Sequence, residues 1–170
     1  MAREDFELRP ATPDAAPAVS AVLQEAARWI TTWRAQLWDP ALLGEDFVAP
    51  FIARGEMLTL KIGGDIAGVM ILEREDPLFW PDRPPGEAAY VHKLAVRRAY
   101  AGQGLAAALL DHGADLTRAQ GRHRLRLDCH PDLAGYYAGL GFRPVDERIV
   151  RHPEAGEIRV ARMERRLDPA

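Results

Sequence analysis

A short segment near the middle of the chain combines two glycines with the start of an apolar helix. From Val96 to Leu110, the chain reads as an extended segment, a turn containing Gly102 and Gly104, and a helix. Glycine lets the main chain approach a ligand without a Cβ atom in the way, and a helix that begins there directs unpaired N–H groups and its positive dipole end outward. The pattern favours a phosphate or pyrophosphate site, although the same spacing also forms ordinary tight turns.

Sulfur and metal chemistry have little support in the sequence. The single cysteine, Cys129, excludes an intramolecular disulfide, and no grouping of Cys and His has the spacing of a zinc site. Apart from its neighbour His130, no arrangement of histidines around Cys129 favours nucleophilic catalysis, so a buried, inert thiol is expected. The sequence therefore predicts no metal.

The elements that must position the glycine turn alternate between strands and helices. Strands are expected at 6–9, 57–62, 66–73, 88–96, 124–129, 142–150 and 158–167, and helices at 13–29, 41–54, 105–120 and 132–140. Thr12 is the expected cap of the first helix, and Gly63-Gly64-Asp65 predicts an antiparallel hairpin. The proline-rich stretch 76–87 is expected to be an irregular loop that borders a binding site. Strands joined partly by helices and partly by hairpins predict a mixed sheet in an α/β or α+β fold.

Size and charge narrow the class of protein. With 170 residues, of which 48% are hydrophobic, the chain fits one domain with a sizeable core. A net charge of -3 gives no general attraction to nucleic acid or to an anionic membrane. The charged amino terminus and the absence of a long apolar run predict a soluble cytoplasmic protein, with no membrane and no nucleic acid among its partners.

Three segments, in this order, resemble the GNAT family of acetyl-CoA-dependent N-acetyltransferases. They are the strand His92-Lys93-Leu94-Ala95-Val96, similar to the family's splayed central strand, the turn Ala101-Gly102-Gln103-Gly104-Leu105-Ala106, similar to its cofactor loop, and Tyr136-Tyr137-Ala138-Gly139-Leu140-Gly141-Phe142, similar to its Tyr-x-x-x-Gly-Phe segment. The resemblance covers essentially the whole chain. It implies one domain over 1–170, with a mixed, mostly antiparallel sheet of six to seven strands and helices on both faces.

By this resemblance, acetyl-CoA is the cosubstrate. The residues implied for binding it are Leu94, Ala95, Val96, Ala101, Gly102, Gln103, Gly104, Leu105, Ala106 and His130. Ala101 stands where the family's loop has Gln or Arg, so main-chain donors must suffice there. His130 stands where many members have Asn, in a connection that is shorter than usual. Arg97 and Arg98 either supply charge near the phosphates or are simply solvated.

Acetyl transfer to an amine also needs a proton acceptor and a proton donor. The resemblance implies that Tyr137 protonates the leaving thiolate, with a phenol pKa of about 10 that suits this role. Tyr90 stands where many relatives have Glu, so the base must lie elsewhere or act through water. His92 lies on the same strand face, and Asp128 matches the position of a carboxylate base in some members. Glu73 is a third option, and each of these side chains also has a purely structural interpretation.

The expected function is direct acetyl transfer to a primary amine of a small molecule or a peptide. By resemblance, Trp33, Trp38, Phe79 and Trp80 flank the acceptor side, where aromatic rings suit an apolar amine but equally pack under loops. A non-catalytic acyl-CoA-binding sensor is the alternative, because the usual Glu and the loop Gln or Arg are missing. A nucleotide-binding domain is weaker still, because no Lys-Ser/Thr follows the glycines. The sequence leaves monomer and homodimer open.

Overall fold

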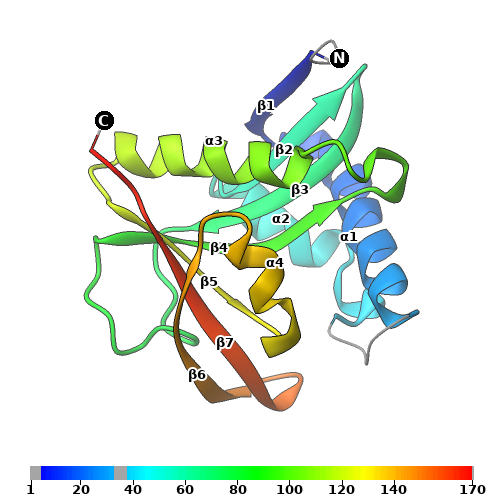
Figure 1. Ribbon diagram of the computed structural model, residues 1–170. Helices are drawn as coiled ribbons and strands as arrows, with labels where there is room; N and C mark the ends of the chain where they lie inside the picture. Colours follow the sequence, from blue (N-terminus) through cyan, green and yellow to red (C-terminus); the bar gives the residue numbers. More distant parts are fainter. Residues whose placement is uncertain (1–4, 33–37, 170) are drawn as a thin grey trace. The chain divides into compact units, whose positions relative to one another are not determined.

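The computed structural model describes residues 5–32 and 38–169 and contains one seven-stranded sheet in the order β1-β2-β3-β4-β5-β7-β6 (Figure 1). The strands are β1 (Phe6–Pro10), β2 (Met57–Ile62), β3 (Asp65–Glu73), β4 (Ala88–Val96), β5 (Arg124–Cys129), β6 (Arg143–His152) and β7 (Gly156–Arg166), and the α-helices are α1 (Ala16–Thr31), α2 (Glu45–Ala53), α3 (Leu105–Ala119) and α4 (Ala134–Ala138). The mixed, mostly antiparallel sheet predicted from the sequence is confirmed. No helix in the described part of the chain is long and apolar enough to cross a membrane.

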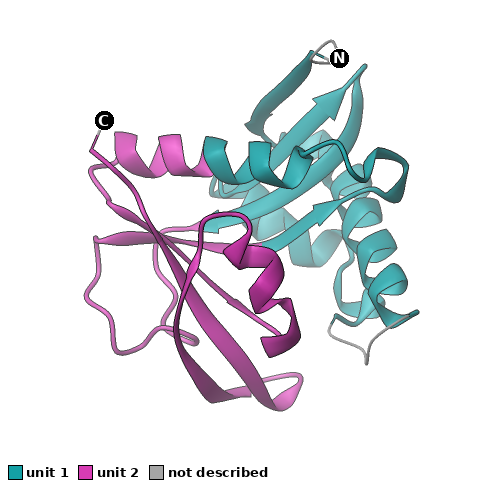
Figure 2. Cartoon of the chain, viewed as in Figure 1, with its two compact units in different colours: residues 1–72, 93–112 teal, residues 73–92, 113–170 magenta. Residues whose placement is uncertain are grey.

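The chain divides into two compact units, and each is built from segments that are distant in sequence (Figure 2). Unit 1 comprises residues 1–72 and 93–112, and unit 2 comprises residues 73–92 and 113–170. The division falls inside β4 and inside α3, so both elements contribute to both units. The glycine turn therefore belongs to unit 1, whereas His92, Asp128 and Tyr137 belong to unit 2.

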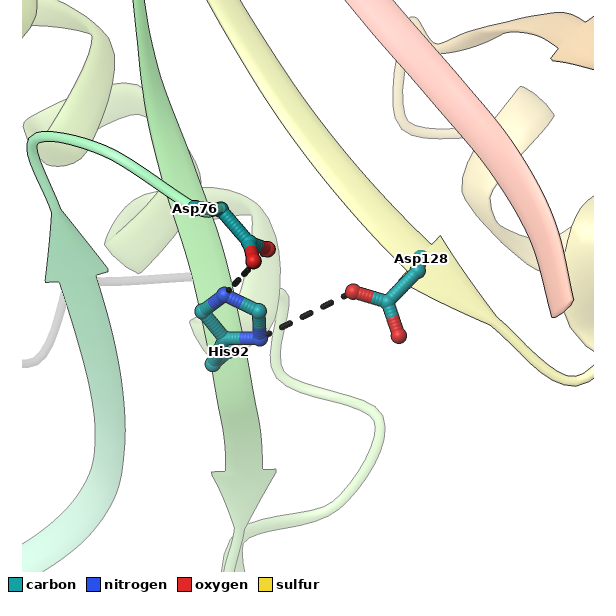
Figure 3. Close-up of side chains that lie close together, drawn as sticks. All are labelled: Asp76, His92 and Asp128. Carbon is teal, nitrogen blue, oxygen red and sulfur yellow. Dashed lines mark ion pairs between the residues drawn. The ribbon is translucent and has the colours of Figure 1, made fainter. Parts of the chain in front are cut away.

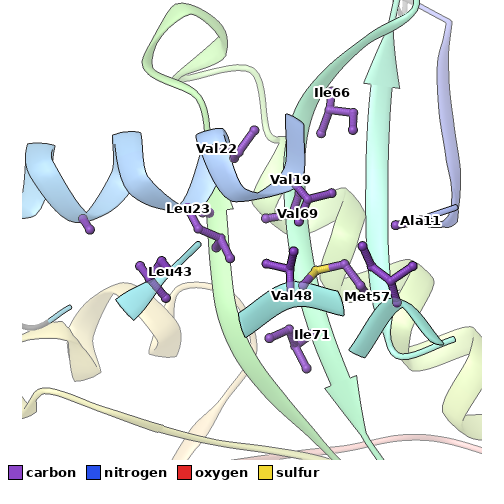
Figure 4. Packing of buried hydrophobic residues seen from close by; sticks show 13 residues of the cluster. Ala11, Val19, Val22, Leu23, Leu43, Val48, Met57, Ile66, Val69 and Ile71 are labelled. Carbon is purple, nitrogen blue, oxygen red and sulfur yellow. The ribbon is translucent and has the colours of Figure 1, made fainter. Parts of the chain in front are cut away.

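The helices α1 and α2 bury their apolar side chains in the core of unit 1. α1 buries Val19, Val22, Leu23 and Ala27, whose spacing places them along one helix face. These side chains join buried residues of α2, β2 and β3 in one apolar cluster (Figure 4); its buried members are Ala11, Val19, Val22, Leu23, Ala27, Leu43, Val48, Ile52, Met57, Ile66, Val69, Ile71 and Ala95. The apolar faces of the helices and strands thus pack together in one core.

Close packing in unit 1 depends on a glycine in β3. The hairpin of β2 and β3 is antiparallel, as predicted, and turns at Gly63 and Gly64. A Cβ atom at Gly68 would lie 3.1 Å from Leu109 Cδ1 and 3.2 Å from the carbonyl oxygen of Ala95. A larger residue at this position would therefore press on α3 and on the main chain of β4.

Unit 2 carries an unusual row of polar side chains on one face of its strands. β4 and β5 are parallel and pair Tyr90 with Arg126, while β5 and β7 are antiparallel and pair Arg126 with Glu164 and Asp128 with Arg162. Since side chains alternate along a strand, these residues point to the same side of the sheet. Both arginines are almost fully buried, at 1% and 0% exposure. Charge is thus a major component of the interior of this unit.

Several local predictions need correction. The side chain of Thr12 does not cap a helix; it donates to Asp14, and a 3₁₀ turn over Pro13–Ala15 precedes α1. The helix expected at 132–140 is divided into a 3₁₀ turn, Pro131–Leu133, and the short helix α4. Weak local propensity explains both differences, because turns and short helices depend on their tertiary contacts.

Candidate active site

Unit 2 brings three titratable side chains from three separate segments together (Figure 3). Asp76 lies in the loop after β3, His92 in β4 and Asp128 in β5. The Nε2 atom of His92 lies 3.0 Å from Asp76 Oδ2 and 3.9 Å from Glu73 Oε1, and its Nδ1 atom lies 3.7 Å from Asp128 Oδ1. The imidazole therefore has a carboxylate facing each of its two nitrogens.

The surroundings of His92 favour its protonated form. Burial opposes the charge and by itself lowers the pKa of His92, but the contact with Asp76 and the negative charges of Asp128 and Glu73 outweigh it. The pKa of His92 consequently lies above its ordinary value of 6.5. The side chain is still 20% exposed, so it is accessible to a reacting group.

The same three residues offer ligand-type atoms within 4.8 Å of one another. The arrangement is nevertheless poor for a single ion, because Asp76 faces Nε2 and Asp128 faces Nδ1. One ion can contact only one of the two nitrogens of an imidazole, whereas a proton can be held on either. The geometry therefore favours proton exchange over metal binding.

Tyr137 lies on α4 in the same unit. Its ring packs edge-on against Tyr136 and Phe142, with centroids 5.1 and 6.1 Å away. Burial raises the pKa of Tyr137 well above its usual range, and the charge of Asp128 adds to this effect. The phenol is therefore protonated over the neutral range.

The remaining polar candidates of unit 2 have structural partners. Burial, followed by the charge of Asp128, raises the pKa of Cys129 to about 12, as expected for an inert thiol. The hydroxyl of Tyr90 lies 3.1 Å from Arg126 Nη1, which donates to it. His130 accepts the N–H of Asp132 at Nδ1, 3.2 Å away, and so caps the 3₁₀ turn before α4.

The glycine turn begins α3 in unit 1. Gly102 and Gly104 have φ angles of 78° and 76°, which L-residues rarely adopt, and a Cβ atom at either would meet open space. The carbonyl of Gly104 accepts the N–H of Ala108, so the helix begins directly after it. By helix geometry, the amides of the first turn, from Leu105 onward, point out of this end. The glycine turn at the start of a helix is thus present as expected, and its role as an anion cradle stays a prediction.

Strand β4 is distorted where it passes His92. Lys93 has a φ of 50°, a left-handed conformation that is uncommon outside glycine. Such a residue interrupts the regular alternation of side chains, as a bulge does. The residues that follow, Leu94, Ala95 and Val96, extend toward the glycine turn, with Ala95 in the core of unit 1.

Both arginines before the turn contact α1. Arg97 Nε lies 3.3 Å from Glu25 Oε2, and the guanidinium of Arg98 stacks 4.0 Å from the ring centre of Trp29. Neither is therefore simply solvated. These contacts place both side chains against α1.

The aromatic residues expected near the acceptor have different surroundings. The ring of Phe79 lies 6.2 Å from that of His92, and Trp38 lies under the ammonium group of Lys93 at 4.8 Å. Trp80 is 2% exposed and packs with Tyr90, 6.1 Å away. Trp33 is outside the described residues. Phe79 is thus the expected aromatic residue that contacts the His92 cluster directly.

No pattern in the sequence marks Asp76 as a site residue. It lies just after the strand that ends at Glu73 and immediately before Pro77, where the chain leaves the sheet. A carboxylate at the start of a proline-rich loop resembles a turn residue, which hides its long-range contact. Only the proximity of this loop to β4 shows that it faces His92.

Comparison with known proteins identifies the family of this chain. The model of the acetyltransferase (GNAT) family matches residues 22–142. The uncharacterized N-acetyltransferase YesJ of Bacillus subtilis is 29% identical over 148 residues, which are 82% of each chain.

Many solved structures share this fold. A GNAT-family acetyltransferase from Listeria monocytogenes has a TM-score of 0.77 and 24% identity, covering 95% of both chains. PaiA N-acetyltransferase of Thermoplasma acidophilum, solved with coenzyme A, has a TM-score of 0.73 and 15% identity, covering 95% of this chain and 99% of its own.

Proposed function

This chain belongs to the GNAT acetyltransferase family, and we propose that it transfers an acetyl group from acetyl-CoA directly to a primary amine of a small molecule or peptide. Tyr137 is the proposed proton donor and His92 the proposed proton acceptor, with Asp128 stabilising the charge that His92 acquires. The observation that carries the proposal is the partly exposed His92, whose two ring nitrogens face the carboxylates of Asp76 at 3.0 Å and Asp128 at 3.7 Å.

Cosubstrate binding is assigned to the glycine turn. Acetyl-CoA supplies an acetyl group activated as a thioester. The amides from Gly102 to Ala106 would bind its diphosphate, because the helix end concentrates N–H donors and positive dipole charge there. Main-chain groups of Leu94, Ala95 and Val96 are proposed to orient the rest of the molecule. A coenzyme A complex of a protein with the same fold supports this assignment.

The protein residues then move two protons. Nδ1 of His92 accepts a proton from the attacking amine nitrogen as its bond to the acyl carbon forms, which prevents reversal of the attack. The hydroxyl of Tyr137 donates a proton to the sulfur as the carbon–sulfur bond breaks. The products are an amide and the free thiol, with no acyl-enzyme. His92 then gives its extra proton to solvent and the Tyr137 phenolate takes one from solvent, so protons and charges balance over the complete cycle.

Release of free thiol from acetyl-CoA, measured across a panel of primary amines, tests the proposed activity. Binding of coenzyme A without turnover of any amine would instead favour a non-catalytic sensor. Calorimetry with acetyl-CoA tests the role of the turn separately. In Gly104→Ala, the added methyl group disfavours the left-handed conformation by about 1–2 kcal/mol. The turn must hold this strained conformation to present its amides, so acetyl-CoA binding is expected to weaken by about 10-fold.

Gly63→Ala is the matched control for this substitution. Gly63 has a φ of 57° and turns the hairpin of β2 and β3, outside the cradle. The Gly63→Ala substitution introduces a similar backbone strain away from the proposed site, so the affinity for acetyl-CoA is expected to stay unchanged. Equal affinity in Gly104→Ala and the unmodified protein would contradict the assignment of the turn.

A further inference from the structure

The carboxylate of Asp76 is buried and has a specific set of partners. Its side chain is only 6% exposed. Oδ1 accepts the N–H of Phe79 at 3.0 Å, and Oδ2 lies 3.0 Å from Nε2 of His92. Beyond His92, Oδ2 has no hydrogen-bond donor among the described residues. Because a buried carboxylate without a donor is costly, the stable arrangement keeps a proton on Nε2.

We propose that Asp76 is a positioning residue, which holds the Nε2–H group of His92 and thereby leaves Nδ1 as the atom that accepts the proton of the acceptor amine. This inference rests on the proposed function and adds a residue to it. Nδ1 points toward Asp128, as Figure 3 shows, on the opposite edge of the ring from Asp76. One carboxylate thus fixes the tautomer while the other faces the atom that becomes charged.

The loop that carries Asp76 is anchored around a buried tryptophan. The main-chain N–H of Trp80 donates to the main-chain carbonyl of Asp76 at 3.0 Å, and this bond closes a tight turn next to the Asp76 carboxylate. The ring of Trp80 has Arg162 at 4.4 Å and Arg126 at 5.2 Å from its centre. Cations packed against an aromatic ring in a desolvated setting are attracted to it, so the tryptophan is firmly held.

Arg162 extends this anchor along the loop. Its guanidinium donates to the carbonyl of Phe79 at 3.1 Å, to Asp82 at 2.6 Å and to Asp146 at 2.7 Å. These contacts join the loop to β7 and β6 through a side chain that is itself completely buried. Charge-assisted hydrogen bonds of this kind restrict motion as well as adding stability. The position of Asp76 is therefore fixed by the interior of unit 2.

The charged groups that face His92 predict how its pKa changes when one of them is removed. They are Asp76 from the loop, Asp128 from β5 and Glu73 from the end of β3. In the neutral ring, Nε2 bears the hydrogen and Nδ1 has the free electron pair. When the amine transfers a proton to Nδ1, the ring becomes an imidazolium with one carboxylate at each edge. Removing the charge of Asp76 makes that state less favourable, while an asparagine retains an acceptor for Nε2–H.

The experiment follows the ring protons of His92 by NMR as the pH is varied, in the full-length protein. Substitution His92→Gln identifies the resonance, because the chain has 5 histidines. In Asp76→Asn, the titration midpoint of His92 is expected to move to lower pH by about one unit, since a nearby opposite charge is lost. The ascending limb of kcat/KM against pH is expected to move with it. The plateau of kcat should fall about 10-fold, with KM for acetyl-CoA unchanged.

Glu75→Gln is the matched control. It removes the same charge from the adjacent position, but Glu75 is exposed and pairs with Arg122. Both the titration and the pH profile are expected to stay as in the unmodified protein. If Asp76→Asn does not fold, Asp76→Glu replaces it, because that variant keeps the charge. In Asp76→Glu, the ascending limb of kcat/KM against pH must then stay at the same pH while kcat falls.

Three results would overturn the inference. The first is an unchanged His92 titration in Asp76→Asn. The second is an ascending limb that moves in Asp76→Glu. The third is a titration that moves in Asp76→Asn without any displacement of the kinetic limb, which would show that Asp76 does not act on the reaction through His92. A protein without turnover on any amine would instead contradict the proposed function, and the NMR titration would still report whether Asp76 holds the ring.

Discussion

The phenol of Tyr137 must remain protonated until the thiolate leaves. Burial raises its pKa above the ordinary value of 10.0. As a proton donor it is active in its protonated form, so its contribution should persist across neutral pH and decline only above pH 10. Tyr137→Phe is expected to lower kcat by about 100-fold, the usual loss when a general acid is removed. Steady-state kinetics between pH 6 and pH 10 measure this effect.

Tyr136→Phe gives the control for that prediction. Tyr136 is the adjacent tyrosine and is 53% exposed, so it resembles Tyr137 in chemistry and sequence position but not in burial. Its kcat should match that of the unmodified protein. Turnover in Tyr137→Phe equal to that of Tyr136→Phe would remove Tyr137 from the role of proton donor.

At the scale of elements, the contact of β3 with α3 depends on the missing side chain at Gly68. A Cβ atom there would press on the main-chain oxygen of Ala95 at 3.2 Å, which cannot turn aside as a side chain can. Gly68→Ala is expected to lower the free energy of unfolding by about 1–3 kcal/mol, as overpacking does. Urea denaturation measures this loss.

Gly135→Ala is the appropriate comparison. Gly135 lies in α4, and a Cβ atom there would meet nothing within 4 Å. Alanine favours the helix by about 1 kcal/mol over glycine, so stability should stay the same or rise. A Gly68→Ala protein as stable as the unmodified chain would show that the elements of unit 1 adjust to the added methyl group.

At the scale of the whole molecule, the buried arginines contribute to how stability depends on pH in the acid range. Hydrogen bonds from Arg162 hold the pKa values of Asp82 and Asp146 below their ordinary value of 3.8. Burial opposes the charge of Glu164, but its bonds with Arg126 and Arg124 dominate and hold its pKa below 4.5.

Because these pKa values are lower in the folded state, their stabilising effect is fully present above pH 4.5 and is lost as the pH falls further. We therefore expect the stabilisation from these carboxylates to be nearly constant from pH 7 to pH 5 and to fall below that range. His92 contributes separately and with the opposite sign: because its pKa is raised in the folded state, its contribution is present below pH 6.5 and is lost as the pH rises above that value. Arg162→Met should make this acid dependence shallower. Denaturation series at several pH values measure it.

Arg159→Met provides the comparison for the acid series. Arg159 pairs with Glu147 on the surface, where the two side chains are 69% and 46% exposed. Exposed pairs contribute little, so the acid dependence should not change. An acid dependence that is equally steep in Arg162→Met would mean that other carboxylates are responsible.

The amino-acid sequence determined the order of the elements, the family resemblance and the glycine turn. These features depend on local patterns: the spacing of apolar residues, the glycines that allow positive φ, and short motifs in a fixed order. It also put forward His92, Asp128 and Tyr137, although it could not choose among the candidate bases.

The tertiary structure alone decided which groups face His92. The parallel pairing of β4 with β5 brings Asp128 near one nitrogen, and the anchored loop brings Asp76 to the other. It also decided that Arg126, Arg162 and Trp80 form a buried group rather than a solvated surface. The physical reason is that these contacts join residues far apart in the chain. Their energies come from burial and charge pairing, which have no local pattern in the sequence.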